Sequence, residues 1–174
     1  TKIPRESGKE EKVANYLLEF AKENELYAEK DEFNNVLIKK DASEGYENHE
    51  TIILQAHIDM VCEKNANVEH DFDNDPIDIT IEDGKVIAKE TTLGADNGVG
   101  VAYAMSILAD KELNHPPIEF LATSDEERGM TGISNFDFSK LSGTKVINLD
   151  SNDEGVVVVG CAGGPVIRIG IPLE

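Results

Sequence analysis

Several apolar, strand-like stretches of this chain run directly into histidine or carboxylate residues. The clearest is "ILQAHID" at positions 53–59, where the apolar run ends in His57 and, two residues later, in Asp59. "SDEERG" at 124–129 and "NLDS" at 148–151 follow further apolar runs, and "GADNG" at 94–98 opens a helix rich in small residues. Ligands of open α/β sheets gather beyond the carboxyl ends of the strands. We therefore expect these four polar groups to meet in one crevice.

The hydrophobic periodicity predicts strands that alternate with helices. "SGKE" at 7–10 has the form of a capping box. The expected helices span residues 9–24 and 98–110, with a short one near 132, and residues 124–130 are expected to form a loop. The expected strands span 35–39, 51–56, 117–123, 145–149, 156–159 and 166–171, and 77–81 and 85–89 form a hairpin around Asp83-Gly84. The prediction is a single α/β domain over residues 1–174, with a largely parallel sheet flanked by helices and an added β-hairpin.

Composition argues against several classes of partner. The chain has 35 acidic and 16 basic residues and a formal net charge of −19. Such a field repels phosphate backbones and anionic lipids, so we expect neither nucleic acid nor a membrane as a partner. No apolar run approaches the ~20 residues that a membrane span needs. Cys62 and Cys161 are the only cysteines, which favours a reducing, cytoplasmic location over a disulfide framework.

The residue types at the strand ends favour a metal centre. Imidazole and carboxylates are the usual ligands of zinc and related divalent ions. His57 and Asp59 are two residues apart on an extended chain and so point to the same side, which would let Asp59 orient the ring of His57. In the adjacent pair Glu126-Glu127, one carboxylate can bind metal while the other acts as a general base.

Each of these residues also has a simpler local interpretation. His57 could be a hydrogen-bonded residue at the end of a strand, and Asp96 could be the N-cap of the helix that starts at 98. Glu126 and Glu127 could form a solvated acidic turn in a chain that is acidic throughout. Cys62 lies near His57, but without a further orienting residue we expect a packed thiol and not a Cys-His nucleophile.

Taken together, the motifs resemble the metallopeptidases of the M20 clan. The motifs are "LQAHIDMV", "TTLGADNGVGVA", "SDEERGMTG", "NLDSNDEG" and "GCAGG", which lie in this order over positions 54–164. The subgroup that the chain most resembles is the aminoacyl-histidine (Xaa-His) dipeptidases, because "GADNG" and "GCAGG" are more similar to this subgroup than to the tripeptidases of the clan.

The resemblance implies a role for each candidate residue in a centre with two divalent ions, with zinc expected and manganese or cobalt as alternatives. His57 and Asp150 would bind the first ion, Asp96 would bridge both ions, and Glu127 would bind the second. Asp59 would lie behind His57, and Glu126 would be the general acid/base. The implied reaction is the hydrolysis of dipeptides, Xaa-His in particular, by an activated water.

The sequence departs from the pattern of these enzymes in one respect. Nothing here matches their last ligand to the second ion, a histidine, or their lid domain, through which a homodimer could form. We therefore interpret the chain as the N-terminal portion of a catalytic domain that is expected to be inactive alone. Another peptidase or a deacylase of the clan, or a non-catalytic metal-binding module, are the alternative functions.

Overall fold

A five-stranded sheet with the strand order β1-β2-β6-β3-β7 organises the structure. The computed structural model describes residues 1–151, 155–160, 163 and 170–171. The strands of the sheet are β1 (Tyr27–Lys30), β2 (Val36–Lys40), β3 (Ile52–His57), β6 (Ile118–Thr123) and β7 (Lys145–Asn148). The helices are α1 (Glu11–Glu23), α2 (Ala95–Ala109), α3 (Glu126–Gly129), α4 (Thr131–Asn135) and the 3-10 helix η1 (Phe138–Lys140).

The predicted, largely parallel α/β sheet is confirmed. β3 pairs in parallel with both β6 and β7, and β2 pairs antiparallel with both β1 and β6. Of the strands that the structure describes in this sheet, β2 is therefore the one that runs antiparallel to the others. His57 lies opposite Thr123 in the β3–β6 register, so these two strands end level with one another. This alignment places the segments that follow them at one edge of the sheet.

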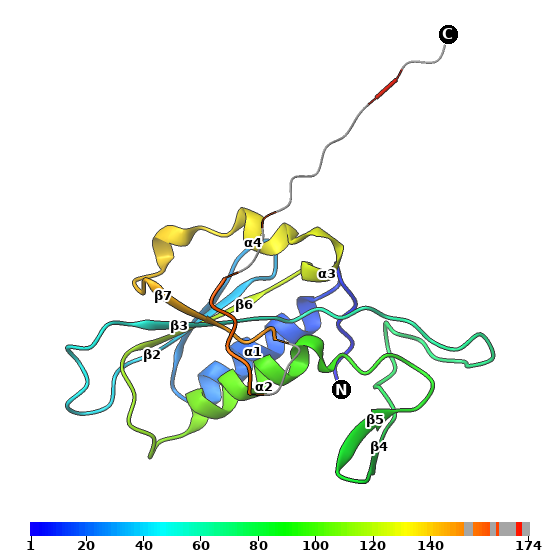
Figure 1. Ribbon diagram of the computed structural model, residues 1–174, viewed down its shortest axis with the longest axis horizontal. Coiled ribbons are helices and arrows are strands. Elements are labelled where there is room, and N and C mark those ends of the chain that lie inside the picture. Colours follow the sequence, from blue (N-terminus) through cyan, green and yellow to red (C-terminus); the bar gives the residue numbers. More distant parts are fainter. Residues whose placement is uncertain (152–154, 161–162, 164–169, 172–174) are drawn as a thin grey trace.

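Helices and loops cover both faces of the sheet (Figure 1). Alternate residues of a strand point to opposite faces, and in β2 Val36 and Ile38 face α1 and α2 while Leu37 faces the other way. The first face packs against Leu17 of α1 and the small-residue side of α2. The second face packs against Phe136 in the segment that contains α4 and η1. Among the described residues, no helix combines the length and the apolar character needed to cross a bilayer.

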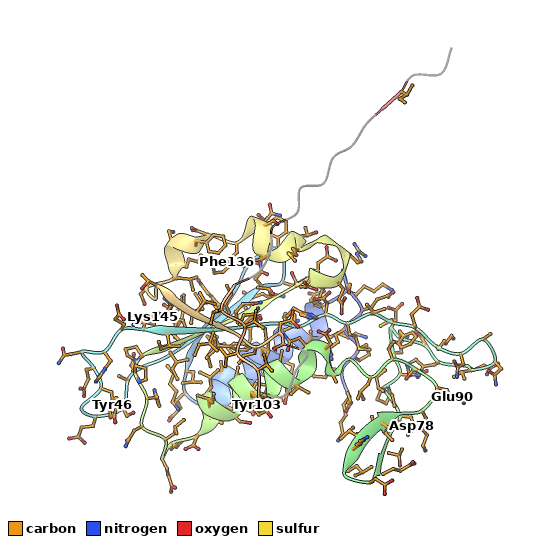
Figure 2. The ribbon with its side chains drawn as sticks, viewed as in Figure 1. Tyr46, Asp78, Glu90, Tyr103, Phe136 and Lys145 are labelled. Carbon is orange, nitrogen blue, oxygen red and sulfur yellow. The ribbon has the colours of Figure 1, made fainter. Side chains whose placement is uncertain are left out.

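The predicted hairpin is also confirmed, and it projects away from the sheet (Figure 1). It consists of β4 (Ile79–Glu82) and β5 (Lys85–Ala88). Asp83 and Gly84 both have positive φ, 50° and 74°, which suits the turn of a two-residue hairpin loop. Figure 2 shows Asp78 at the end of the hairpin nearer the rest of the chain.

The capping-box interpretation of residues 7–10 is wrong. α1 begins after Glu10, and no side chain caps it. The hydroxyl of Ser7 instead donates to Asp59 Oδ2 at 2.7 Å. The Glu10 carboxylate accepts from the backbone N–H of Gly8. Ser7 therefore contacts the end of β3, and the capping motif was a chance match to a different set of hydrogen bonds.

Other differences from the prediction concern short or exposed elements. β1 was not predicted, because its sequence YAEK is half polar and only partly buried. The expected loop at 124–130 contains the single-turn helix α3. Residues 156–159 form no strand, and their valines are exposed, Val159 at 98%. The strand expected at 166–171 lies largely outside the described residues.

The packing of α1 on the sheet leads to a stability prediction. Leu17 has no exposed surface and belongs to the core between α1 and the sheet. Leu17→Ala should lower the free energy of unfolding by about 2–5 kcal/mol, since it leaves a cavity at a fully buried position. Urea unfolding measures this change. Leu113→Ala is the control, because Leu113 is 45% exposed and should change stability by less than about 0.5 kcal/mol. Equal losses in the two variants would contradict this account of the core.

Candidate metal centre

His57 is the last residue of β3 and lies at the centre of the candidate site. Its side chain is 1% exposed. The ring atom Nδ1 lies 3.2 Å from Asp59 Oδ1, and Nε2 lies 2.8 Å from Asp96 Oδ1 and 3.8 Å from Asp150 Oδ2. Burial acts to lower the pKa of His57, but the hydrogen bonds with Asp59 and Asp96 outweigh it and raise the pKa to about 9. Asp59 therefore holds the ring through Nδ1, and Nε2 faces the carboxylates of Asp96 and Asp150.

Asp59 is completely buried, and each of its oxygens has two hydrogen-bond partners. Oδ1 faces the His57 ring and accepts from the backbone N–H of Glu126 at 3.1 Å. Oδ2 accepts from the Ser7 hydroxyl at 2.7 Å and from the N–H of Glu127 at 3.2 Å. Burial acts to raise the pKa of Asp59, but the hydrogen bonds from His57, Ser7 and these amides outweigh it and lower the pKa to about 2. Asp59 is thus a carboxylate that orients His57 and the start of α3.

Glu126 and Glu127 form the first turn of α3. The preceding Asp125 has a left-handed backbone, φ 53°, so the chain turns sharply where β6 ends. This turn directs the two backbone amides at Asp59. Burial raises the pKa of the Glu126 carboxyl, and the Asp150 and Glu127 charges add to that effect against the opposing influence of His57. Burial and nearby Asp96 likewise raise the pKa of Glu127.

Asp96 lies in the non-helical stretch that precedes the regular part of α2. Asp96 and Asn97 both depart from helical backbone angles, and the peptide bond between them is cis. Asn97 Oδ1 accepts from the backbone N–H of Gly100 at 3.1 Å, so Asn97 caps the regular helix. The alternative interpretation of Asp96 as the N-cap is therefore wrong. Its side chain is instead free to face His57, and it is 62% exposed.

Among the residues that the structure describes, two groups of side chains have ligand atoms close enough to share a metal ion. In each group the candidate atoms lie within 4.8 Å of one another: one is His57, Asp96 and Asp150, and the other is His57, Glu126 and Glu127. One imidazole and several carboxylates suit zinc, manganese or cobalt. Burial and the neighbouring Asp96 charge raise the pKa of Asp150. The carboxylates therefore repel one another, and a bound cation would relieve that repulsion. The residues present fit a divalent metal centre.

Cys62 is a packed thiol beside the end of β3. Its thiol is half-buried and lies 3.8 Å from the Met60 carbonyl oxygen. Burial raises the pKa of Cys62 to about 11, with a contribution from the Glu6 charge. Because the thiolate is the reactive form, this raised pKa disfavours a role for Cys62 as a nucleophile. This agrees with the expectation of a packed thiol.

The sequence motifs predict that the six candidate residues lie near one another, but they do not reveal every residue that supports them, Ser7 and Asn97 among these. The pattern around Ser7 predicts a helix cap, and no pattern in the sequence points to Asn97. Asn97 is 3% exposed and is the residue that starts the regular part of α2. The polar pattern around Ser7 gave a signal, but a single sequence does not reveal which buried carboxylate a serine contacts over 52 positions.

Comparison with known proteins shows that the chain is similar to peptidases. The model of Peptidase family M20/M25/M40 matches residues 53–160. The cytosol non-specific dipeptidase of Escherichia coli is 46% identical over 162 residues, which cover 93% of this chain and 33% of that protein. The chain thus spans about a third of the length of this curated relative.

Solved structures show the same relationship. The crystal structure of aminoacylhistidine dipeptidase from Vibrio alginolyticus superposes with a TM-score of 0.85 at 47% identity, covering 88% of this chain and 31% of that one. An aminopeptidase from Bacillus cereus superposes with a TM-score of 0.70 at 24% identity, covering 87% of this chain and 41% of that one. The second likeness shows the shared fold alone.

The geometry of the centre predicts how metal binding depends on Asp96. Asp96→Ala should weaken zinc binding by more than the roughly 10–100-fold that is lost when a residue behind a ligand is changed, because a ligand itself is removed. Isothermal titration calorimetry with zinc chloride measures the affinity. The control is Asp78→Ala, which removes an aspartate of the hairpin that is 70% exposed. Equal zinc affinities of the two variants would exclude Asp96 as a ligand.

Proposed function

Because the chain belongs to the M20/M25/M40 peptidase family, we propose that it carries the metal centre of a dipeptidase that prefers Xaa-His substrates. The observation that carries the proposal is the convergence of His57, Asp96 and Asp150 with the Glu126-Glu127 pair at one edge of the sheet. The names of two similar proteins, a non-specific dipeptidase and an aminoacylhistidine dipeptidase, support the substrate class. The name of the first also supports a cytoplasmic location.

The proposed roles are those that the resemblance to the M20 metallopeptidases implies, and the closeness of these side chains supports them. His57 and Asp150 would hold the first ion, Asp96 would bridge the two ions, and Glu127 would hold the second. Asp59 would keep the His57 ring in place from behind. Divalent ions held here, with zinc as the expected metal, would polarise the scissile carbonyl group and lower the pKa of the attacking water.

Glu126 is the residue that we propose moves the proton. It would accept a proton from the attacking water and pass that proton to the amine of the leaving amino acid. Burial and neighbouring carboxylates raise the pKa of Glu126, which suits a group that must both gain and lose a proton near neutrality. Its backbone N–H donates to Asp59, so the position of the base is tied to the residue that orients His57.

The proposal is tested by hydrolysis of a dipeptide panel. Because the chain spans about a third of its curated relative, the assay uses the full protein that contains it. The panel holds Ala-His, Ala-Leu and an N-acetyl amino acid, each with and without added zinc or manganese. Metal-dependent cleavage that prefers Ala-His would support the proposal. Cleavage of the N-acetyl amino acid alone would indicate a deacylase, and metal binding without any cleavage would indicate a non-catalytic module.

Substitution of Glu126 separates proton transfer from metal binding. Glu126→Gln should lower kcat at least ~100-fold, since general acid–base catalysis contributes about 10²–10⁴-fold. Its zinc affinity should stay near that of the unsubstituted protein. Steady-state kinetics and calorimetry measure the two properties. Glu112→Gln is the matched control, because Glu112 is an exposed glutamate in the loop after α2. Near-normal turnover by Glu126→Gln would reject Glu126 as the base.

A further inference from the structure

Arg5 is a buried cation next to the candidate metal centre. Its relative exposure is 8%, although arginine is rarely so buried unless it is paired. The N-terminal segment that contains it runs beside the end of β3, where the backbone N–H of Met60 donates to the Arg5 carbonyl oxygen at 3.1 Å. In Figure 1 this dark blue segment passes between α3 and the loop that leads into α2.

The guanidinium group of Arg5 joins two loops that carry candidate ligands. Nη1 donates to the carbonyl oxygens of Ile58 at 3.0 Å and Asp59 at 2.8 Å. Nη2 donates to the carbonyl oxygen of Gly94. Both acceptors of Nη1 lie within two residues of His57, and Gly94 lies two residues before Asp96. One rigid, planar group thus spans the two loops that meet at the His57–Asp96 contact.

The two glycines that flank Asp96 leave room for this group. A Cβ atom on Gly94 would lie 2.5 Å from Arg5 Nη2, and one on Gly98 would lie 2.8 Å from the same atom. Gly94 also has a left-handed backbone, φ 70°, which glycine adopts at low cost. The absence of side chains at the two glycines of "GADNG" therefore leaves space for the Arg5 guanidinium beside Asp96.

The position of Asp96 depends on the backbone of the Gly94–Gly98 loop more than on packing of the Asp96 side chain. The Asp96 side chain is 62% exposed, so packing does not fix it. The backbone around it is fixed by the Arg5–Gly94 hydrogen bond and by the N–H of Gly98, which donates to the same Gly94 carbonyl at 3.1 Å. Loss of the Arg5 contacts would release the loop on the side that faces His57.

We propose that Arg5 is a positioning residue that sets the distance between Asp96 and His57 and thereby the metal affinity of the centre. The inference rests on the metal centre of the proposed function. It predicts that removal of Arg5 changes the zinc affinity in the direction opposite to that expected from charge alone. Arg5 is a cation beside Asp59 and Asp96, so its removal should by charge alone strengthen the binding of another cation. If Arg5 positions the loop, its removal should weaken binding instead.

The first test compares the zinc affinities of Arg5→Met and Arg5→Lys with that of the unsubstituted chain. Both variants should bind zinc about 10–100-fold more weakly, the range for residues that orient ligands. Arg5→Lys keeps the charge but lacks the planar fork that reaches both loops. Lys2→Met is the control, since it removes an exposed cation of the same segment. Circular dichroism establishes a temperature at which every variant is folded, so a purely stabilising role would leave the affinity unchanged.

The second test asks whether Arg5 and Gly98 act on the centre together. In Gly98→Ala the new methyl group should displace the guanidinium and weaken zinc binding, although the Arg5 side chain is still present. In the Arg5→Met background the same substitution should have little further effect. Losses of zinc affinity that do not add in the double variant are expected if the two residues act through the same interaction. Independent effects of the two substitutions, or unchanged or tighter zinc binding by Arg5→Met, would overturn the inference.

A third measurement keeps the inference testable if the unsubstituted chain binds no zinc, a result that would count against the proposed metal centre itself. Hydrogen exchange reports the local opening of backbone segments. Exchange at the Gly98 amide, which donates to Gly94, should be at least ~10-fold faster in Arg5→Met than in Lys2→Met. Equal exchange rates in the two variants would show that Arg5 does not hold the loop.

Discussion

The candidate centre depends on the buried carboxylate of Asp59. An unpaired buried charge is very costly, yet Asp59 is tolerated because both oxygens have two partners each. Those partners come from three separate parts of the chain: the N-terminal segment, the end of β3 and the start of α3. The carboxylate cannot lose one partner without leaving a buried charge poorly satisfied. Asp59 therefore holds the three segments in fixed positions relative to one another. His57 and Glu126 lie in two of these segments, so their positions are fixed as well.

The same region gathers charges that do not stabilise the fold. Asp96, Glu126, Glu127 and Asp150 face one imidazole, and burial with mutual repulsion raises the pKa of the last three carboxyls. A chain with a formal net charge of −19 could have placed these carboxylates far apart in solvent. Their convergence is a local cost, and such costs are concentrated at functional sites. The charge pattern thus points to a cation as a partner of these carboxylates.

The sequence predicted those features whose cause is local or periodic. The apolar spacing of α1, the buried strands β3 and β6, and the Asp83-Gly84 hairpin all follow from short-range patterns, and the structure contains them. β1 was missed because a half-exposed edge strand has no strong pattern. The sequence also predicts a strand at residues 156–159, but β propensity depends on a partner surface, and these side chains are exposed.

Residues that support the centre were harder to find, because their contacts span long stretches of sequence. The family match begins at residue 53, and the motif-based assignments lie between positions 57 and 150. Arg5, Ser7 and Glu10 precede that region, and all three are buried. They contact the Asp59 turn, the Gly94 loop and the Asp125 amide. The N-terminal segment therefore reaches three of the loops that carry candidate residues. A motif indicates candidate ligands, but the geometry that brings them together depends on distant residues that lie beside them only in the folded chain.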